Sequence, residues 1–321
     1  MTIVSERSRQ PWIGGIAIFV AFLGFAIVLF YGFFKVWNKG EVENKTYMLF
    51  VIAAFFIGIV VNLIWSYWFY SRRIVVDKDK IQYHETVYPW HDVTEVILSG
   101  KHKFGFFGFR MEATTLVFRD NTKGYIFQDF YANAPQIKSF IKYVILEKSD
   151  MPLPIKPQAV YTMAKGEIFW RYSGNPLFSL RGILTWGLIA FIMYCAFGMQ
   201  SPTGNPDTYN KLLLGLPFCA FWFLLNAFSN YYFEVSDNFL IIKNHYFFWI
   251  KEVYKLSDVE QFVYETEPKQ ANMLRIILAD FTQKRYRAGS LTDATWHDMK
   301  ADFETKGIEV RNECVHPVTP I

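Results

Sequence analysis

Four long apolar stretches, each without a charged residue, constrain this chain more than any other feature. They cover residues 12–34, 47–70, 182–199 and 212–233. A helix needs about 20 apolar residues to cross the ~30 Å hydrocarbon core of a bilayer, and Trp12, Trp65 and Trp68 lie near the ends of the stretches, as interfacial anchors do. The alternative is a buried helix of a soluble protein, which applies best to the third and shortest stretch. The pattern predicts an integral membrane protein with four transmembrane helices in two hairpins.

Composition agrees with this prediction and excludes several other classes. Of 321 residues, 52% are hydrophobic and 19% are charged, against about 25% charged in soluble proteins. A net charge of +4 is too small to indicate a nucleic-acid partner, and three cysteines do not form a disulfide scaffold. The chain also lacks the Walker, Gly-x-Ser-x-Gly and His-Glu-x-x-His motifs. We therefore expect no enzymatic activity, no cofactor and no metal site.

Basic residues beside the stretches predict the orientation in the membrane. The two short loops, 35–46 and 200–211, carry four lysines, whereas the opposite flanks carry ten lysines and arginines, among them Arg7, Arg72 and Arg73. Cytoplasmic flanks carry the excess of basic residues in membrane proteins. Both termini and both large polar regions are therefore expected in the cytoplasm.

The two polar regions, 72–150 and 234–310, repeat one pattern. The Asp-Val pair at 92–93 corresponds to the pair at 258–259, and the segment 116–122 corresponds to 276–282 at an offset of 160. About seven extra residues around 244–249 precede the second Asp-Val pair. A repeated order of stretch, stretch and polar region indicates an internal duplication.

Each polar region is expected to form short antiparallel strands followed by one helix. Alternating residues between turns, as at 74–76 and 81–87, are typical of half-buried hairpins. In the first region Asn133 is a candidate N-cap, and in the second Ser290 and Asp293 resemble a capping box. Gly307 is expected to end the second helix. The apolar stripes of the two helices are expected at Ile137, Phe140, Ile141, Val144 and Ile145, and at Trp296, Met299 and Phe303.

A polar module that leaves a two-helix apolar hairpin directly, with an Asp-Val element, a late hairpin and a C-terminal helix, resembles the bacterial pleckstrin-homology-like membrane proteins. The resemblance implies a partly open barrel of two antiparallel sheets closed by a helix, in a multi-pass protein of the bacterial cytoplasmic (inner) membrane. The domains expected on this basis are a transmembrane hairpin (1–71), a pleckstrin-like domain (72–150), a Pro-rich linker with an interfacial elbow (151–178), a second hairpin (179–233), a second pleckstrin-like domain (234–310) and a tail (311–321).

A Phe-rich basic segment in the first polar region is the most distinctive candidate site. Its phenylalanines could enter a membrane while the cations meet anionic headgroups, could dock a protein, or could fill the barrel as part of a hairpin. The candidate residues are Lys101, Lys103, Phe104, Phe106, Phe107, Phe109 and Arg110.

Four polar side chains within the apolar stretches form a second candidate set. Asn62 lies four residues before Ser66, and Asn226 lies four residues before Asn230. Amides are costly in hydrocarbon unless they are paired, so hydrogen bonds between helices are expected to hold the hairpins together.

These features predict a non-enzymatic membrane scaffold that presents two pleckstrin-like binding modules at the cytoplasmic surface. The expected partners are membrane lipids and another protein, and not nucleic acid; the oligomeric state is open. One alternative is an immunity or antitoxin-like protein that neutralises a membrane-active toxin. Another is a protein that senses or handles anionic lipids, for which Lys101, Lys103 and Arg110 would lie at headgroup depth.

Overall fold

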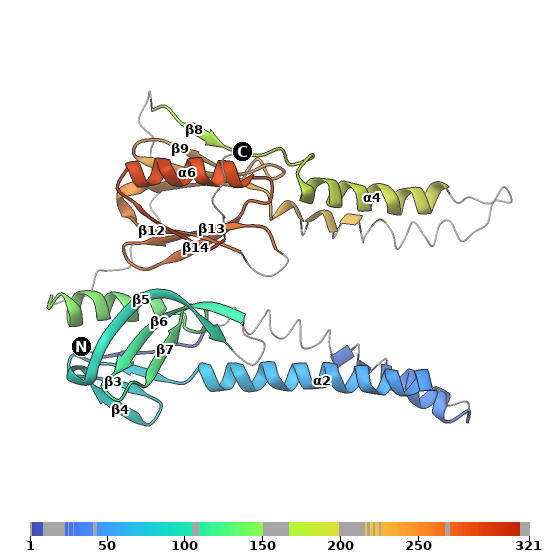
Figure 1. Ribbon diagram of the computed structural model, residues 1–321, viewed down its shortest axis with the longest axis horizontal. Coiled ribbons are helices and arrows are strands. Elements are labelled where there is room, and N and C mark those ends of the chain that lie inside the picture. Colours follow the sequence, from blue (N-terminus) through green and yellow to red (C-terminus); the bar gives the residue numbers. More distant parts are fainter. Residues whose placement is uncertain are drawn as a thin grey trace, which may run out of the picture. The chain divides into compact units, whose positions relative to one another are not determined.

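The structure, a computed structural model, describes residues 2–8, 29–40, 44–104, 109–149, 167–198, 226–266 and 270–314, with short pieces at 23–24, 26–27, 216, 219–220 and 222–224. The chain divides into two compact units, Met1–Ile155 and Lys156–Ile321. Each unit combines mainly antiparallel sheets with helices, so the fold is α+β (Figure 1).

Unit 1 contains two sheets and a C-terminal helix. The first sheet has the order β1 (Ile3–Val4), β2 (Ile74–Val76), β3 (Lys80–Tyr83), β4 (Thr86–Pro89). After the 3-10 turn Trp90–Asp92, the second sheet has the order β5 (Val93–Phe104), β6 (Phe109–Phe118), β7 (Lys123–Phe127). The helix α3 (Ala134–Ser139) continues as a π-helical segment, η3 (Phe140–Leu146).

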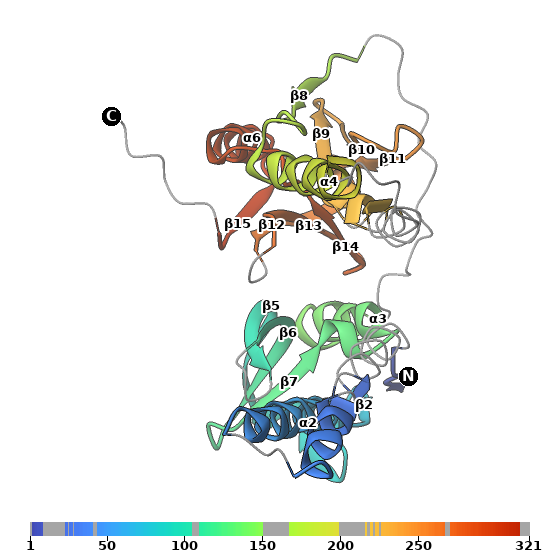
Figure 2. The same cartoon turned by 90° about the vertical axis from the view of Figure 1, so that its right-hand side faces the viewer.

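Unit 2 repeats this order and adds one strand. Its first sheet contains β8 (Trp170–Tyr172), β9 (Tyr231–Val235), β10 (Phe239–Asn244) and β11 (Lys251–Lys255), which lie side by side in Figure 2. After the 3-10 turn Leu256–Asp258, its second sheet contains β12 (Val259–Glu265), β13 (Met273–Leu278) and β14 (Gln283–Arg287). The helix α6 (Asp293–Thr305) follows, and β15 (Glu309–Asn312) returns to pair in parallel with β12.

The strand registers of the two units coincide pair by pair. Ile74 pairs with Tyr83 in unit 1 as Phe233 pairs with Ile242 in unit 2, an offset of 159. Tyr83 then pairs with Thr86 as Ile242 pairs with Glu252, so the offset rises to 166 across the longer second hairpin. The pairs Ala113–Phe127 and Met273–Arg287 keep the offset of 160 in the second sheet. The duplication expected from the sequence is thus present in the described strands.

The turn that precedes β7 and β14 is repeated at the level of single hydrogen bonds. Asp120 Oδ1 accepts bonds from the backbone N and the Oγ1 of Thr122, at 3.0 and 2.6 Å. Asp280 Oδ1 accepts the same two bonds from Thr282, at 2.9 and 2.6 Å. The residue between them has a positive φ in both units, 61° and 64°. An Asx side chain that bonds two residues ahead stabilises such a turn.

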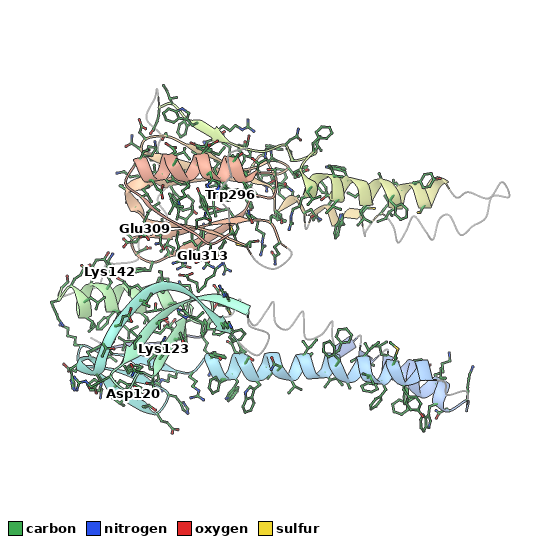
Figure 3. All side chains as sticks on the ribbon, in the orientation of Figure 1. Asp120, Lys123, Lys142, Trp296, Glu309 and Glu313 are labelled. Carbon is green, nitrogen blue, oxygen red and sulfur yellow. The ribbon has the colours of Figure 1, made fainter. Side chains whose placement is uncertain are left out.

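Each unit has its own hydrophobic core beneath its helix. The expected helix stripes at 137–145 and at Trp296, Met299 and Phe303 are buried in their units. Trp296 (Figure 3) packs against Phe233 of one sheet and Tyr264 of the other, with ring centroids 5.9 and 4.7 Å apart. The helix therefore closes the end of a two-sheet sandwich.

The prediction of four transmembrane helices is wrong. Within the described residues, one helix is long and apolar enough to cross a membrane: Phe50–Tyr70, within α2 (Asn44–Tyr70). The third stretch forms α4 (Leu180–Gly198), whose apolar part, Leu180–Cys195, is shorter. The fourth stretch ends in β9, because Tyr231, Tyr232 and Phe233 are strand residues. Most of 12–34 lies outside the described residues.

The physical reason for this error lies in composition. Aromatic and branched apolar residues fill a core strand as readily as a membrane helix, and a short apolar run does not distinguish the two. The two-hairpin arrangement and the boundaries 1–71 and 179–233 depended on that interpretation. The inner-membrane location and the orientation remain predictions.

In both units the strand that precedes the apolar segment pairs with the strand that follows it. β1 pairs with β2, and β8 pairs with β9, although the apolar segment separates the two partners in the sequence. The segment expected to be an interfacial elbow therefore supplies a strand of the sheet at Trp170–Tyr172, while 151–166 lies outside the described residues.

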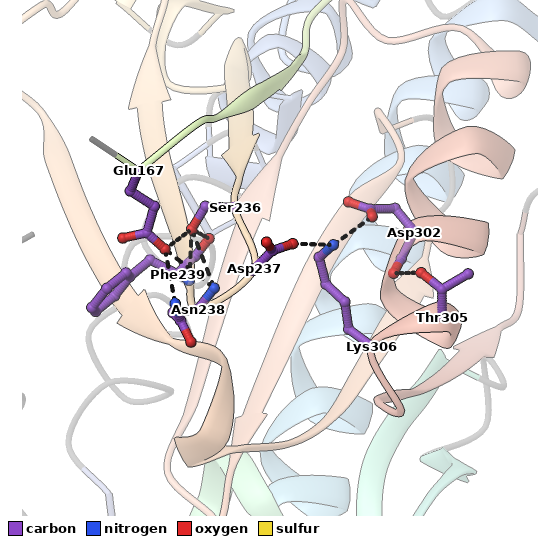
Figure 4. A network of polar contacts seen from close by, with 8 residues as sticks. All are labelled: Glu167, Ser236, Asp237, Asn238, Phe239, Asp302, Thr305 and Lys306. Atoms are coloured by element: carbon purple, nitrogen blue, oxygen red, sulfur yellow. Dashed lines mark hydrogen bonds and ion pairs between the residues drawn. The ribbon is translucent and has the colours of Figure 1, made fainter. Parts of the chain in front are cut away.

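Polar contacts hold the N-terminal side of β8 and the end of α6 to the β9–β10 turn (Figure 4). Glu167 Oε1 accepts bonds from Ser236 Oγ at 2.6 Å and from the backbone N of Asn238 at 3.3 Å. On the other side of this turn, Lys306 Nζ bonds Asp302 at 2.7 Å and Asp237 at 3.4 Å. The segment before β8 and the C-terminal end of α6 therefore meet at one turn.

Three smaller expectations are refined by the structure. Asn133 is the residue before α3, but its side chain binds the N-terminal segment instead of the helix. The N-cap of α6 is Thr292, whose Oγ1 accepts from the backbone N of Thr295 at 3.3 Å, in place of the expected Ser290 box. Gly307 ends that helix with a φ of 76°, as expected. The expected tail at 311–321 begins inside β15.

Candidate functional site

The apolar face of α2 is exposed along the helix. Only 18% of the apolar window is buried within the protein, and Trp65 and Trp68 near its C-terminal end are each 70% exposed. A core helix of a soluble protein buries such residues, because each large apolar side chain gains about 1.5–3 kcal/mol on leaving water. The helix is therefore suited to an apolar surrounding.

The N-terminal segment is fixed beside the end of this helix. Ser5 donates its backbone N–H to Ile74 O and accepts the N–H of Ile74 on its Oγ, both at 2.8 Å. Arg7 Nε donates to Ser71 O at 3.0 Å. Asn133 accepts from the backbone N of Glu6 and donates to Val4 O, both at 2.8 Å. These bonds bring a residue from the start of the chain to the point where α2 ends.

Three arginines meet at this junction. Arg72 and Arg73 follow the end of α2 after Ser71, and Arg7 reaches the same place through the bonds above. Together they line a cavity of about 400 Å³ whose other walls come from α2 and the β3–β4 turn. The lining residues are Arg7, Trp65, Trp68, Phe69, Arg72, Arg73 and His84.

Aromatic rings hold two of the arginine side chains in place. The Arg72 guanidinium lies 4.4 Å from the Phe69 ring centroid, and that of Arg7 lies 5.8 Å from the Trp68 ring. Within the described part of the chain, none of the three arginines forms an ion pair with a carboxylate. Their positive charge is available to a ligand.

Unit 2 does not repeat this cluster. By strand register, Arg72 and Arg73 correspond to Tyr231 and Tyr232, at the offset of 159. The alignment of β1 with β8 has an offset of 167, which matches Arg7 with Gly174. The arginine junction is therefore a property of unit 1, not of the repeated fold.

A second cavity of about 250 Å³ shares Phe69 and Arg72 with the first and is lined by residues of β3–β4 and β6–β7. Its lining includes Tyr83, Thr86 and Gly124. The Tyr83 hydroxyl is buried with no hydrogen-bond partner among the described residues, and burial raises the pKa of this phenol well above its ordinary value.

The same corner of unit 2 is filled by side chains. Thr86 and Gly124 correspond to Glu252 and Lys284, which form an ion pair at 2.7 Å. Glu252 also accepts bonds from the hydroxyls of Tyr254 and Tyr286, at 2.9 and 2.8 Å. Small residues at these two positions thus distinguish the corner of unit 1 from that of unit 2.

The Phe-rich candidate site divides between core and surface. Phe104 is buried, 5.1 Å by ring centroid from both Tyr70 and Phe130, as the barrel-filling alternative expects. Lys103 and Arg110 are exposed, at paired positions of β5 and β6, and Lys101 is half-buried on β5. Phe106, Phe107 and the side chain of Phe109 lie outside the described residues.

The polar candidates within the apolar stretches, where their side-chain hydrogen bonds are described, bond to residues of the same segment. Asn226 Nδ2 donates to Trp222 O at 2.9 Å, and Asn230 Nδ2 donates to Asn226 O at 2.8 Å. On α2, Asn62 is half-buried and Ser66 is buried. The side-chain hydrogen bonds described for the two asparagines are therefore i to i−4 bonds and not bonds between helices.

Sequence reasoning found the members of the arginine junction only as separate anchors and basic flanks. Arg7 is far from Arg72 in the sequence, and only the pairing of β1 with β2 brings them together. The sequence offers no signal for this pairing, because the correspondence of 3–4 with 170–171 comes from strand register and not from similar residues.

The described residues contain no group of three His, Cys, Asp or Glu side chains placed to hold a metal ion. No protein-family model and no curated protein sequence matches the chain.

Proposed function

We propose that the chain is a non-enzymatic scaffold, anchored to a membrane by α2, that presents two pleckstrin-like binding units beside the bilayer. The observation that carries this proposal is α2 itself, an exposed apolar helix of membrane-spanning length that runs directly into the first sheet of unit 1. A direct connection of this kind holds a binding unit at a defined height above the membrane.

The edge of unit 1 supports the scaffold part of the proposal. In unit 2, β15 pairs in parallel with β12, and Phe262 and Tyr264 are buried. Their counterparts at the offset of 166 are Val96 and Leu98 on β5, which are only half-buried, and β5 is an edge strand in the described part of the sheet. An exposed edge accepts an added strand from a partner. The partner expected here is a protein segment that lies in parallel along β5, as β15 lies along β12.

Membrane anchoring is tested by extraction of the full chain from membranes at alkaline pH. We expect the wild-type chain to stay in the membrane pellet, and a variant with Val61→Glu and Phe55→Glu to be released, because both side chains are exposed on α2 and a charge in the bilayer centre costs about 2.5–3.5 kcal/mol. Release of the wild-type chain would overturn the proposal.

The scaffold role is tested by purification in polymer discs. A polypeptide retained at a fixed ratio by the wild type should be lost from an Ile97→Lys variant, because Ile97 is 39% exposed on β5 and a lysine opposes pairing at an edge strand. Lys255→Gln on the exposed surface of unit 2 is the control. Retention by both variants alike would refute recruitment at the β5 edge.

A further inference from the structure

We propose that Arg7, Arg72 and Arg73 form a binding site for the phosphate group of an anionic phospholipid at the membrane end of unit 1. The inference rests on the proposed function, since it requires α2 to lie in a membrane. It places lipid recognition at the junction of helix and sheet instead of at the Phe-rich segment.

The depth of the site follows from the helix. Trp65 and Trp68 are exposed within the last turns of α2. Tryptophan is amphipathic and is enriched at the interface between hydrocarbon and headgroups. Arg72 and Arg73 follow within five residues of Trp68, and a helix advances only about 1.5 Å per residue. The arginines therefore lie at headgroup depth when α2 spans the membrane.

The chemistry of the three side chains fits a phosphate. A guanidinium presents parallel N–H donors that bind phosphate oxygens in pairs. Arg7 uses its Nε to bond Ser71 O, which leaves its two terminal nitrogens for a ligand. Arg72 and Arg73 donate no hydrogen bond from their guanidinium groups to any described residue. Three cations, none of which forms an ion pair with a described carboxylate, favour an anionic ligand over a zwitterionic one.

The cavity beside the arginines fits the rest of a lipid. Its volume of about 400 Å³ is bounded by Trp65, Trp68 and Phe69 on the side of α2. Ligand pockets of ~300–1,000 Å³ with apolar walls and few charged groups are typical of small-molecule sites. Apolar walls that continue into an exposed apolar helix suit the glycerol and first methylenes of a lipid, whereas a free phosphate would use the arginines alone.

Unit 2 provides an internal comparison. At the matching positions it has Gly174, Tyr231 and Tyr232, and Trp65 and Trp68 correspond to Leu224 and Ala227. General attraction of the repeated fold to membranes does not explain a cluster that only one copy contains. The site is assigned to unit 1 alone.

The experiment uses the full chain in discs of phosphatidylcholine, with phosphatidylglycerol as the anionic probe. Native mass spectrometry counts the phosphatidylglycerol molecules that remain bound, and the melting temperature reports stabilisation. We expect one retained phosphatidylglycerol per chain for the wild type. The variant R72Q/R73Q, which leaves the structural bond of Arg7 intact, should weaken retention at least tenfold, and R7Q/R72Q/R73Q should abolish it.

Two charge-matched variants serve as controls. K78Q/K80Q/K148Q removes three exposed cations of unit 1 away from the cavity, and K101Q/K103Q/R110Q removes the cations of the Phe-rich segment. Both should retain the lipid as the wild type does. If K78Q/K80Q/K148Q loses phosphatidylglycerol as strongly as the arginine variants do, net charge alone explains retention. If only K101Q/K103Q/R110Q loses it, the lipid binds at the Phe-rich segment. Either result overturns the proposal.

Two further outcomes separate the possible ligands. Displacement of phosphatidylglycerol by millimolar inorganic phosphate would indicate a free-anion site, and equal retention of phosphatidylcholine would show that the site does not select an anionic phospholipid over a zwitterionic one. Both contradict the proposal. Failure of the lipid test while the chain still resists alkaline extraction would reject the site and leave the anchoring intact, so the two proposals are tested separately.

Discussion

Arg275 and Glu265 form an ion pair whose side chains are only 3% and 2% exposed. The contact is bidentate, with Nε and Nη2 each 3.1 Å from a carboxylate oxygen, and Gln283 accepts a further bond from Nη1 at 2.8 Å. At the scale of single residues, this pair removes two charges almost completely from water. A buried pair of this kind contributes little net stability but makes the loss of either partner costly.

Replacement of one partner should therefore destabilise unit 2 more than replacement of both. We expect Glu265→Gln to lower the free energy of unfolding by about 3–5 kcal/mol, since it leaves a buried guanidinium uncompensated. The double variant Glu265→Leu, Arg275→Met should lie closer to the wild type. Urea unfolding of the full chain measures the free energy of unfolding of both variants. A double variant less stable than the single one would contradict this account.

His245 is a second residue whose environment controls its charge. Burial, with a contribution from the positive charge of Arg171, lowers the pKa of this imidazole to about 4. Its Nε2 atom is buried without a partner among the described residues, and its ring lies 4.6 Å from that of Tyr232. The folded state thus favours the neutral imidazole.

The lowered pKa of His245 determines the direction in which pH changes stability. Because the pKa of His245 is lower in the folded chain than in the unfolded chain, the unfolded state binds more protons between about pH 6.5 and 4. Stability should fall as the pH falls through this window, with a slope of at most about 1.4 kcal/mol per pH unit. His245→Gln should remove this contribution, whereas His91→Gln, on an exposed side chain, should not. Identical pH profiles for the wild type and His245→Gln would refute the assignment.

At the scale of elements, β8 comes before the apolar segment of unit 2 in the sequence, and a close backbone contact positions the chain that follows it. A Cβ on Gly174 would lie 1.6 Å from the carbonyl oxygen of Ser290, so the chain passes this point only as glycine. Glu167 and Lys306 hold the regions on either side of the β9–β10 turn. Unit 2 therefore depends on a segment that the sequence places before the apolar stretch.

Substitution at this glycine tests that dependence. Gly174→Ala should destabilise unit 2 by about 1–3 kcal/mol or more, because the obstructing atom belongs to the backbone and cannot rotate away. Gly187→Ala on α4 is the matched control, since a Cβ there meets no atom within 4 Å. Thermal unfolding and hydrogen exchange of 167–179 give the readout. An unchanged exchange rate in Gly174→Ala would show that the contact is not needed.

At the scale of the whole molecule, two hydrophobic cores with no residue in common stabilise the two units. The cores use corresponding strands but different side chains, as the open corner of unit 1 and the Glu252–Lys284 pair of unit 2 illustrate. Duplication of one fold thus leaves each copy free to acquire its own site. The arginine junction is the example that carries our functional inference.

Separate cores predict additive stability effects. Asn133→Ala releases the two bonds that hold the N-terminal segment in unit 1, and Gly174→Ala acts in unit 2. Distant, independent sites add within about 0.3–0.5 kcal/mol. Hydrogen exchange in the double variant should increase in each unit by the amount that its own single variant produces. A larger effect than the sum would reveal energetic coupling between the cores.

Much of the fold was predictable from local pattern. The helix stripes at Ile137–Phe140 and Trp296–Phe303, the repeated Asp-Val pairs and the glycine end of α6 depend on residues close in sequence. The periodicity of the stripes indicates the buried face. The membrane helices were over-predicted, because hydropathy counts apolar residues without knowing whether a strand will pair with them. β15 was missed because a four-residue strand has no signal apart from its partner.

The sequence by itself determined the α+β units, their duplication and the apolar character of α2, since each of these follows from composition and period along one segment. Only the tertiary structure decided that β1 pairs across an apolar segment with β2, that Tyr231–Phe233 are strand residues, and that Arg7 meets Arg72 and Arg73. The physical reason is the range of the forces concerned. Helical and strand periods act over a few residues, whereas strand pairing and charge clustering join residues far apart in the chain, and local patterns carry no record of them.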